Sequence, residues 1–291
     1  MTSRGLRGTT RLAGLVGWPV AHSRSPRLHN EWLRRYGIDG AYVPLPVPPG
    51  RLEVALRGLQ ASGFAGVNVT IPHKLEAFRL SDVLSDAARR CGSVNTLRFA
   101  PDGSIVGDSS DGQGFVDSVR AAGVDPSRGP ALVLGAGGAA RAIAAALQAA
   151  RVQVHLANRT RARAEELAEL LAEGGDGPSP RVLDWGDREA ALGDQALLVN
   201  TTSIGMTGAS EARSPCRLDQ APTGLVVCDI VYAPRVTPLL AEAGARGLRT
   251  VEGLGMLLHQ ARAGFADWFG VDPAVDAALF DLVGNDEGGT G

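Results

Sequence analysis

Gly135-Ala136-Gly137-Gly138-Ala139-Ala140 carries the strongest structural signal in this chain. It joins a short apolar run, residues 131–134, to an alanine-rich segment with helical character, residues 139–150. A strand, a glycine turn and a helix in this order are the context that the dinucleotide-binding pattern G-x-G-x-x-G/A requires. Gly135 permits the tight turn, Gly137 lets the backbone approach a pyrophosphate, and the helix N-terminus directs N–H groups at that anion. We therefore predict that this turn binds a dinucleotide; a glycine-rich turn without a ligand is the alternative.

The end of the next predicted strand indicates which dinucleotide is bound. Asn158-Arg159-Thr160 follow that strand, residues 152–157. At this position NAD-binding proteins offer an acidic residue to the ribose 2′-hydroxyl, whereas an arginine accommodates a 2′-phosphate. Here there is no acid, Arg159 can pair with a phosphate through two hydrogen bonds, and Thr160 and Arg163 add a hydroxyl and a charge. Arginines at a solvated helix start would oppose the helix dipole, so we predict NADP rather than NAD.

Alternating strand and helix patterns extend over most of the chain and predict an α/β fold with mostly parallel sheets. In the first part, strands are expected at residues 12–17, 41–45 and 64–71, helices at 26–36 and 51–62, and a hairpin at 94–99 and 104–107. In the second part, strands are expected at 131–134, 152–157, 197–200 and 225–231, and helices at 112–122, 139–150 and 161–172. Helices are also expected at 254–269 and 273–283, before a frayed tail at 285–291.

The length of 291 residues favours two domains, because a single hydrophobic core stops growing efficiently at roughly 250 to 300 residues. The pattern changes near Asp111, and we place the domain boundary there. We predict a first α/β domain at residues 1–111, completed by the C-terminal helices within residues 251–291. Residues 112–250 are predicted to form a doubly wound Rossmann domain that binds the cofactor.

Composition and charge exclude several classes of protein. With 44% hydrophobic and 21% charged residues, the chain resembles an ordinary globular protein. A formal net charge of −2 gives no electrostatic reason to bind nucleic acid or an anionic membrane, so a small-molecule ligand is expected. The three cysteines lack metal-ligand spacing, so we expect reduced thiols and no metal site. Without a signal peptide or an unbroken apolar span, we predict a cytoplasmic protein.

Lys74 is the one lysine among 29 basic residues, and it follows the segment Asn68-Val69-Thr70-Ile71-Pro72. Strand alternation puts Asn68 and Thr70 on one face, and Pro72 starts the first turn of a helix. A cation in that turn opposes the helix dipole, so stability alone does not account for the lysine. An ammonium can also release a proton when its pKa is lowered, which a guanidinium cannot do. We predict a functional Lys74; a surface lysine left by chance is the alternative.

Two further segments place polar side chains at the ends of predicted strands. In the first, Ser23 and Ser25 precede a proline-started helix, and both could donate hydrogen bonds to a carboxylate. Ser25 could instead cap that helix. In the second, Asp111 directly precedes a predicted helix, where it is either an N-cap or the carboxylate partner of Lys74.

Together these segments resemble the shikimate dehydrogenase family, and the resemblance runs from about Leu12 to Gly270. The matching motifs are Gly-x-Pro-x-x-His-Ser-x-Ser-Pro at 17–26, Asn-Val-Thr-x-Pro-x-Lys at 68–74, Val-Asn-Thr at 94–96, the glycine turn at 135, Asn-Arg-Thr at 158–160, and Gly-Leu-Gly-Met at 253–256 with Gln260. The resemblance implies that the first domain, with the C-terminal helices, binds substrate and that the second binds NADP. It also implies reversible reduction of 3-dehydroshikimate to shikimate by NADPH, a step toward the aromatic amino acids.

The resemblance assigns roles residue by residue. Ser23 and Ser25 look like ligands of the substrate carboxylate, and Lys74 and Asp111 like the catalytic pair. By the same resemblance, the ligands of the ring hydroxyls are Asn68, Thr70, Asn95 and Gln260. The wall around nicotinamide and substrate includes Asn200, Thr201, Thr202, Ser203, Tyr232 and Gly253. The Lys74 ammonium would stabilise charge on the carbonyl oxygen and supply the proton, while Asp111 would hold a hydroxyl and orient the lysine.

One departure from the family pattern bears on the substrate. The family usually reads Asn-Thr-Asp-Gly where this chain has Ser109-Ser110-Asp111-Gly112, so an amide beside the predicted catalytic carboxylate is missing. Quinate or an amino analogue of shikimate is therefore an alternative substrate. A catalytically silent NADP-binding regulator is an alternative of another class, because fold alone does not give function. A homodimer is one assembly that the sequence leaves open.

Overall fold

The computed structural model describes residues 5–208 and 213–285. These residues form two compact units. The first contains the described residues of Met1–Arg89, Ser93–Ser110 and Gln260–Gly291, and the second contains those of Arg90–Gly92 and Asp111–His259. Asp111 and residues 251–259 thus group with the second unit, although the sequence pattern placed them with the first. Residues 286–291 of the predicted tail lie outside the described residues.

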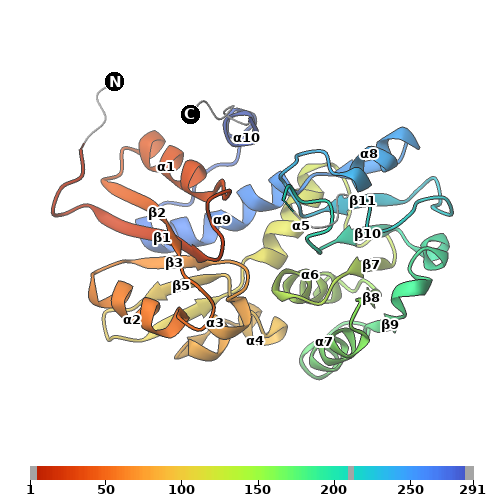
Figure 1. The fold of residues 1–291 in the computed structure, drawn as a ribbon, viewed down its shortest axis with the longest axis horizontal. Coiled ribbons are helices and arrows are strands. Elements are labelled where there is room, and N and C mark those ends of the chain that lie inside the picture. Colours follow the sequence, from red (N-terminus) through yellow and green to blue (C-terminus); the bar gives the residue numbers. More distant parts are fainter. Residues whose placement is uncertain (1–4, 209–212, 286–291) are drawn as a thin grey trace. The chain divides into compact units, whose positions relative to one another are not determined.

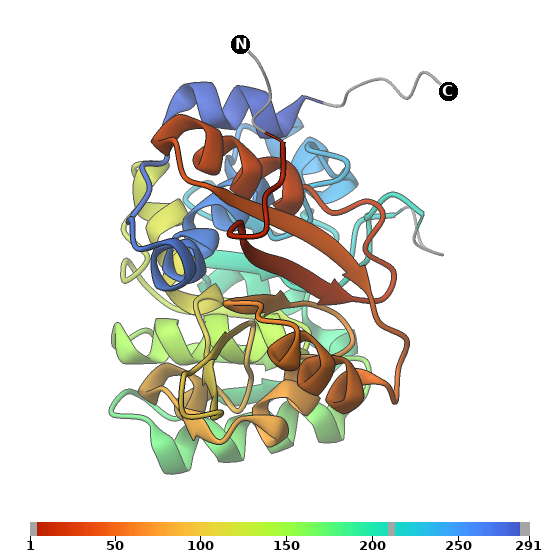
Figure 2. The same cartoon turned by 90° about the vertical axis from the view of Figure 1, so that its left-hand side faces the viewer.

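The first unit is a six-stranded sheet with helices on both faces (Figures 1 and 2). The spatial order of its strands is β2-β1-β3-β5-β6-β4. These strands are β1 (Arg11–Gly17), β2 (Gly40–Pro46), β3 (Gly66–Val69), β4 (Val83–Leu84), β5 (Thr96–Phe99) and β6 (Ile105–Asp108). The helices that belong wholly or largely to this unit are α1 (Ser25–Tyr36), α2 (Leu52–Ala61), α3 (Lys74–Leu80), α4 (Asp86–Cys91), α9 (Gly253–Phe269) and α10 (Ala277–Gly284).

The sheet of the first unit departs from parallel pairing at β5. β1 pairs in parallel with β2 and β3, as the alternation of strands and helices predicts. β5 runs antiparallel to both β3 and β6, because β5 and β6 form the predicted hairpin. In the turn between them, Oδ1 of Asp102 accepts hydrogen bonds from the N–H and the hydroxyl of Ser104 at 2.9 and 2.7 Å. The predicted hairpin is confirmed.

Two different apolar layers cover the faces of this sheet. On one face, buried residues such as Val67 and Leu97 pack with residues of α2, α3 and α4. On the other face, α1 contributes Trp32 and α9 contributes Trp268 to an aromatic cluster with Tyr42 of β2. In Figure 1, α1 and α9 accordingly lie on one side of the strands, and α2 and α3 lie on the other.

The second unit is a parallel sheet in the doubly wound order β12-β11-β10-β7-β8-β9. Its strands are β7 (Ala131–Leu134), β8 (Val154–Ala157), β9 (Arg181–Leu183), β10 (Leu197–Asn200), β11 (Val226–Asp229) and β12 (Arg249–Val251). Its helices are α5 (Asp111–Ala121), α6 (Gly138–Ala149), α7 (Arg161–Gly174) and α8 (Pro238–Ala245), with two 3₁₀ turns at Trp185–Asp187 and Ala190–Asp194. All strand pairs are parallel, and β7 lies between β8 and β10, so the strand order reverses there.

Strand alternation builds both apolar layers of the second unit. Ala131 and Val133 face the layer that contains buried residues of α5, α6 and α7. Leu132 and Leu134 face the opposite layer, which contains buried residues of α8. A strand whose every residue is buried reads as a continuous apolar run, which is why β7 was predicted from its sequence. The predicted α/β fold is confirmed.

The elements that the sequence pattern does not predict are short: α4, α8, β4, β9 and β12. In α8 a local signal exists, because Thr237 accepts the N–H of Leu240 as the N-cap and a proline stands in the first turn. α10 starts at Ala277 rather than at residue 273. The reason is Asp276, whose Oδ1 accepts the N–H of Leu279 at 2.8 Å and caps the helix.

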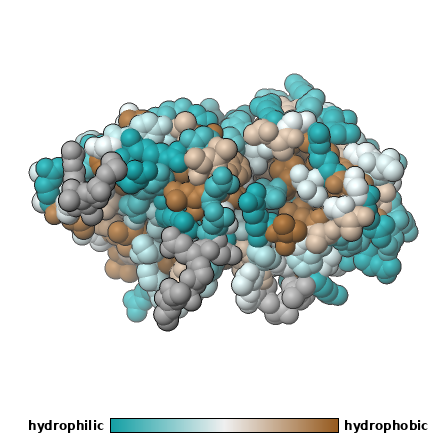
Figure 3. Space-filling model, turned by 90° about the horizontal axis from the view of Figure 1, so that it is seen from above, coloured by the Kyte–Doolittle hydropathy of each residue, from teal (hydrophilic) through white to brown (hydrophobic). Residues whose placement is uncertain are grey.

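Polar residues cover much of the face that Figure 3 shows, and hydrophobic residues appear there in separate patches. Among the described residues, large hydrophobic side chains that are well exposed are few, with Leu6 and Ile71 the most exposed at 76% and 66%. None of the helices in the described ranges combines the length and the apolar composition needed to cross a membrane.

Gly66 allows the closest approach between β3 and α9. A Cβ at this position would lie 2.1 Å from the carbonyl oxygen of Leu97 and 2.2 Å from Nε1 of Trp268, which donates a hydrogen bond to that oxygen at 3.0 Å. We expect Gly66→Ala to lower the free energy of unfolding by about 2–3 kcal/mol, as overpacking does. Gly58→Ala, on α2 with no atom within 4 Å of its Cβ, should instead add about 0.5–1 kcal/mol. Urea unfolding of both variants and the wild type measures these changes, and a midpoint for Gly66→Ala at or above that of the wild type would contradict the prediction.

Candidate active site

The glycine turn after β7 is packed against the ends of β8 and β10. Gly135 has φ +113°, a left-handed value that residues with a Cβ rarely adopt. A Cβ on Gly135 would lie 2.5 Å from Oγ1 of Thr201, and this hydroxyl donates to the carbonyl oxygen of Leu134 at 2.6 Å. The N–H of Gly135 donates to the carbonyl oxygen of Ala157 at 2.8 Å. The turn is therefore held at the point where the strand order reverses, which is where open α/β sheets bind ligands.

The N-terminus of α6 fits a bound pyrophosphate. Gly137 is its N-cap and is exposed, and no side chain of the described residues caps it. A Cβ at Gly137 would meet no atom within 4 Å, so the space in front of the helix is open. The first turn holds no acidic residue that would repel an anion. The first N–H groups of this 12-residue helix can therefore donate to phosphate oxygens.

Arginines gather at the end of β8, where the sequence predicts a 2′-phosphate. Nδ2 of Asn158 donates to the carbonyl oxygen of Thr160 at 2.8 Å and holds the turn that presents Arg159. Arg163 is exposed in the first turn of α7. Arg159 lines a cavity of about 280 Å³ whose other lining residues are Trp185, Arg188, Glu189, Ile204, Arg213, Ser214, Pro215 and Arg217. Arg217 is paired with Asp219 and Arg188 with Glu189, so the four guanidinium groups that line the cavity still exceed the carboxylates beside them and favour an anionic ligand.

Three of these arginines were not predicted: Arg188, Arg213 and Arg217. They come from the segments that follow β9 and β10, far along the chain from the glycine turn. Arg188 is fixed by its neighbours, because its guanidinium lies 4.5 Å from the centre of the Trp185 ring and Nε donates to the carbonyl oxygen of Pro215 at 2.8 Å. Their place in the cavity could not be predicted from the sequence, because nothing in their own segments indicates which strand end these arginines approach.

A buried carboxylate ties together the loops that carry Thr201–Ser203 and Tyr232. Asp229 ends β11 and is 2% exposed. Nδ2 of Asn200 donates to its Oδ1 at 3.0 Å, and the hydroxyl of Thr237 donates to its Oδ2 at 2.7 Å. Burial raises the pKa of Asp229 to about 6, although these hydrogen bonds act in the other direction. Sequence reasoning missed Asp229; an acidic residue at the end of an apolar strand was the available signal.

The first unit contains most of the residues predicted to bind substrate. Ser25 is 5% exposed and is the first residue of α1, whose N-cap is Arg24, so the structure does not support the capping alternative for Ser25. Oγ of Ser23 accepts the N–H of Ser25 at 3.3 Å, so the two hydroxyl-bearing residues lie together. Thr70 follows β3 and donates its N–H to the carbonyl oxygen of Val16 at 2.9 Å, beside the end of β1.

Hydrogen bonds link the segments that carry Lys74 and Asp111. The carbonyl oxygen of Lys74 accepts the N–H of Val94 at 3.1 Å. The next residue, Asn95, accepts the N–H of Ser110 at 2.9 Å, and Ser110 directly precedes Asp111. Lys74 and Asp111 are the first residues of α3 and α5. The lysine therefore does stand at a helix start, where its charge opposes the dipole as predicted.

The residues predicted to form the wall around the nicotinamide belong to the second unit. Tyr232 is half-buried and Ser203 is exposed, and both stand on loops that follow parallel strands. A Cβ on Gly253 would lie 2.4 Å from the carbonyl oxygen of Ile230, so this glycine is required where α9 starts against the segment after β11. Gly253 thus has a packing reason that is independent of any ligand.

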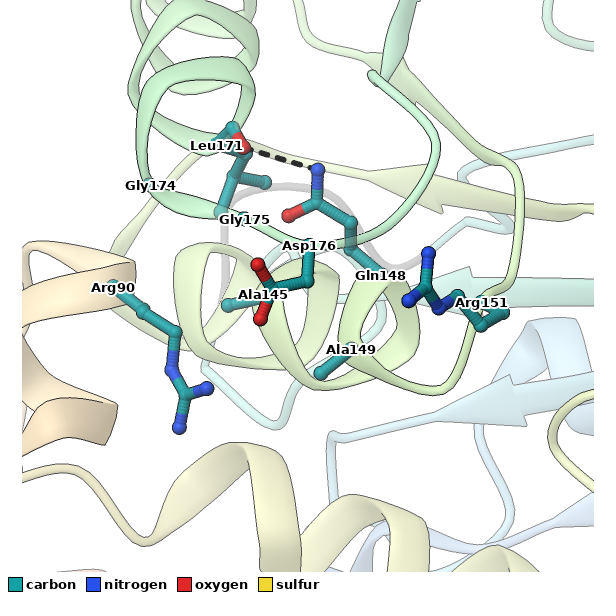
Figure 4. A pocket seen from close by; sticks show the side chains of 9 residues that line it. All are labelled: Arg90, Ala145, Gln148, Ala149, Arg151, Leu171, Gly174, Gly175 and Asp176. Atoms are coloured by element: carbon teal, nitrogen blue, oxygen red, sulfur yellow. Dashed lines mark hydrogen bonds between the residues drawn. The ribbon is translucent and has the colours of Figure 1, made fainter.

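A second cavity, of about 200 Å³, opens at the C-terminal end of α6. Figure 4 shows the Gln148 amide directed at the carbonyl oxygen of Leu171, to which it donates at 3.0 Å, while Arg90 and Arg151 point in different directions. The same Nε2 also donates to the carbonyl oxygen of Pro178 at 3.2 Å. The polar group at the centre of this cavity is therefore bonded to backbone, and none of the predicted site residues lines it.

Comparisons with known proteins agree over almost the whole chain. The family model for the shikimate dehydrogenase substrate binding domain matches residues 15–97, and the model for shikimate / quinate 5-dehydrogenase matches residues 122–176.

A protein of Acidiphilium cryptum named shikimate dehydrogenase (NADP(+)) is 56% identical over 97% of this chain and 98% of its own length. A crystal structure of a shikimate dehydrogenase in complex with NADP+ is 32% identical, with a TM-score of 0.89 and 96% of both chains covered. The shikimate 5-dehydrogenase of Thermus thermophilus, crystallised with NADP(H) and shikimate, is 35% identical, with a TM-score of 0.82 and 94% and 98% of the two chains covered.

The fold and the arginine-lined strand end define a dinucleotide-dependent protein of the doubly wound α/β class. The chain belongs to the shikimate dehydrogenase family, because identity above half extends over nearly the full length of a relative. The family predicted from the sequence motifs is thus confirmed.

The pKa of Asp229 predicts how stability varies with pH. Because the folded-state pKa of about 6 lies above the ordinary value of 3.8, the group stabilises the fold below pH ~4 and loses that contribution as pH rises through 6. Relative to Asp229→Asn, the wild-type protein should lose about 3 kcal/mol of unfolding free energy between pH 4 and pH 7. Urea unfolding of both proteins across this range measures the difference. Parallel pH profiles for the two proteins would show that Asp229 does not titrate in this window.

Proposed function

We propose that the protein is an NADP-dependent shikimate dehydrogenase, which catalyses the reversible reduction of 3-dehydroshikimate to shikimate on the route to the aromatic amino acids. The observation that carries this proposal is the 56% identity, over 97% of the chain, to a protein named shikimate dehydrogenase (NADP(+)). The enzyme class and the cofactor predicted from the sequence are confirmed at this level. The roles of single residues stay proposals, and the contacts described above support them.

In this proposal, NADP is held at three places of the second unit. The glycine turn and the start of α6 hold the pyrophosphate, and Arg159 with its neighbouring arginines holds the 2′-phosphate. The third place is the loop after β10, where Thr201, Thr202 and Ser203 are assigned to the nicotinamide. When bound as NADPH, the cofactor supplies the hydride to the substrate carbonyl carbon.

Lys74 supplies the proton and Asp111 orients the reacting hydroxyl. As the carbonyl carbon is reduced, negative charge develops on its oxygen, and an ammonium group both stabilises that charge and donates the proton. In the reverse direction, the neutral amine of Lys74 takes the hydroxyl proton, and Asp111 accepts a hydrogen bond from a substrate hydroxyl. The hydrogen bonds from Val94 to Lys74 and from Ser110 to Asn95 support this pairing, since they place both segments beside Asn95.

The first unit holds the residues assigned to the substrate carboxylate and ring hydroxyls. Ser23 and Ser25 bind the carboxylate. The ring hydroxyls are bound by Asn68, Thr70, Asn95 and Gln260. Tyr232, on the second unit, is assigned to the substrate by its resemblance to the family pattern. Burial of Ser25 to 5% exposure and the bond between Asn95 and Gln260 support a preformed polar site.

The purified protein should reduce NADP in the presence of shikimate. The same assay with quinate and with aminoshikimate identifies the preferred substrate. Turnover chiefly with shikimate supports the proposal, and turnover with an analogue alone would favour the alternative that Ser109 and Ser110 raise. Binding of NADP without turnover of any of the three would favour a regulator.

Lys74→Arg keeps the positive charge but cannot release a proton at usable pH. We expect both Lys74→Arg and Lys74→Ala to lower kcat at least about 100-fold, in the range that general acid–base groups contribute. NADP affinity, measured by fluorescence titration, should stay unchanged. Arg79 is exposed on the same helix, so Arg79→Ala serves as the control and should keep the wild-type kcat. A Lys74→Arg variant with full turnover would remove proton transfer by Lys74 from the mechanism.

Arg159→Ala should weaken the binding of NADP much more than the binding of NAD, because only NADP carries the 2′-phosphate with which Arg159 pairs. We expect Kd for NADP to rise about 10- to 100-fold, the range of one charged hydrogen-bond partner, and Kd for NAD to change less than about 3-fold. Isothermal titration of both cofactors measures this ratio. An equal loss for the two cofactors would contradict the assignment of the 2′-phosphate to Arg159.

Assembly and location stay predictions. A homodimer is testable by sedimentation velocity, where a monomer at all concentrations would exclude it. The cytoplasm stays an expectation from the sequence, with which Cys91, Cys216 and Cys228 agree, because all three are buried and none forms a disulfide.

A further inference from the structure

A continuous line of hydrogen bonds runs through the proposed substrate site of the first unit, and it begins at Tyr42 on β2. The Tyr42 hydroxyl donates to Oδ1 of Asn68 at 2.7 Å. Nδ2 of Asn68 donates to Oγ1 of Thr96 at 3.1 Å, and the Thr96 hydroxyl donates to Oδ1 of Asn95 at 3.1 Å. Nδ2 of Asn95 donates to Oε1 of Gln260 at 3.1 Å. These five residues are called the amide relay below.

Backbone atoms set the direction of the amide relay. The carbonyl oxygen of Asn95 can only accept, so the group of Asn68 that faces it at 3.2 Å must be Nδ2. The N–H of Ser110 can only donate, so the group of Asn95 that faces it at 2.9 Å must be Oδ1. Both amide orientations follow from these two contacts. The hydroxyls of Tyr42 and Thr96 then donate in the same direction along the line.

Asn95 consequently offers donors rather than acceptors to a substrate. Its Oδ1 accepts from the Thr96 hydroxyl and from the N–H of Ser110, and the Ser110 hydroxyl also lies within hydrogen-bond distance of it at 3.2 Å. Its Nδ2 faces Oγ of Ser110 at 3.0 Å and Oε1 of Gln260 at 3.1 Å, and either proton can turn to an oxygen of a ligand. This arrangement matches a hydroxyl or carbonyl oxygen that accepts a hydrogen bond.

Tyr42 is held by the aromatic core at the start of the amide relay. Its ring stacks on that of His29, with centroids 4.0 Å apart and planes 2° from parallel. The Trp268 ring lies 6.1 Å from the Tyr42 ring, and Trp268 is fastened by its bond to the backbone of Leu97. Burial lowers the pKa of His29 to about 3, so the stacked imidazole is neutral near neutral pH. The phenol oxygen therefore stays where it meets Asn68.

We propose that Tyr42 is a positioning residue for substrate binding, whose hydroxyl keeps the amides of Asn68 and Asn95 in the orientation that donates to a substrate oxygen. With 2% of its surface exposed, Tyr42 acts through Asn68 rather than by touching the substrate. Asn68 is 4% exposed, and without the phenol its buried Oδ1 loses its 2.7 Å donor. The neighbouring His29 side chain interacts with Asn68, but neither of its ring nitrogens is in hydrogen-bond geometry to replace the phenol. A buried acceptor that loses its donor is costly, so the Asn68 amide shifts and the rest of the amide relay loosens. This inference rests on the proposed function, because shikimate is the ligand.

Tyr42→Phe tests the proposal because it removes the hydroxyl and keeps the ring. We expect KM for shikimate to rise about 10-fold, with kcat within about 2-fold of wild type and NADP affinity unchanged, as for loss of one buried hydrogen bond. Tyr36→Phe is the matched control. Its hydroxyl accepts the N–H of Ala274 at 3.0 Å in the same unit but outside the amide relay, so this variant should keep the wild-type KM.

Thr96 supplies an independent test at the middle of the amide relay. Thr96→Val should raise KM for shikimate in the same direction, and Thr96→Ser, which keeps the hydroxyl, should restore it. Combining Tyr42→Phe with Thr96→Val should cost little more than either change alone, because both interrupt one line of hydrogen bonds. A wild-type KM for Tyr42→Phe, or strictly multiplicative effects in the double variant, would overturn the proposal.

Wild-type turnover separates this proposal from the proposed function. If the wild-type protein does not oxidise shikimate with NADP, the proposed function fails and the inference falls with it. If the wild type is active but Tyr42→Phe and Tyr36→Phe share the same KM, the positioning role of Tyr42 fails alone. Thermal unfolding of both variants shows whether a difference in KM merely follows a difference in stability.

Discussion

A buried amide must find its hydrogen-bond partners inside the protein, and this constraint organises the ligand-bearing edge of both units. In the first unit, Asn68, the last residue but one of β3, is bonded to Tyr42, Thr96 and backbone. In the second unit, Asn200 at the end of β10 is fully buried and is bonded to Asp229 and to the loop that follows it. The Asn68 amide joins neighbouring strands near their ends, and the Asn200 amide fixes the start of the loop after β10. Loops that start at fixed points can present ligand-binding groups with little loss of entropy on binding.

The constraint also explains why polar groups tolerate burial in a chain whose strands are almost wholly apolar. Asp229 retains a carboxyl group at 2% exposure because Asn200, Thr237 and the N–H of Val231 all donate to it. Burial still disfavours its ionised form, which is why its pKa rises to about 6. The energetic cost is local, whereas the benefit extends to two loops. A network of this kind specifies one arrangement of the loops more strongly than apolar packing would.

Charge is distributed differently from polarity in the second unit. One cavity of this unit is lined by four arginines, among them Arg159 and Arg188, and by the single acidic residue Glu189. Arg188 and Arg217 are already paired with Glu189 and Asp219, and the net positive charge of the lining favours an anionic ligand. The start of α6 adds oriented N–H groups to this field. Positive charge in the arginine-lined cavity and at the start of α6 therefore favours the binding of an anionic cofactor at two places.

Local patterns were sufficient to predict the longer elements and the sites that lie within one segment. The glycine turn, Asn158-Arg159-Thr160 and the start of α3 at Lys74 depend on the conformational preferences of a few consecutive residues, and those preferences are legible in the sequence. β4, β9 and β12, of two or three residues each, form only by pairing with a neighbour, so no period reveals them. Tyr42 lies 26 residues from Asn68, and Gln260 lies 165 residues from Asn95. Hydrogen bonds depend on direction in space, and the direction in which distant side chains meet arises only when the sheets and helices have packed.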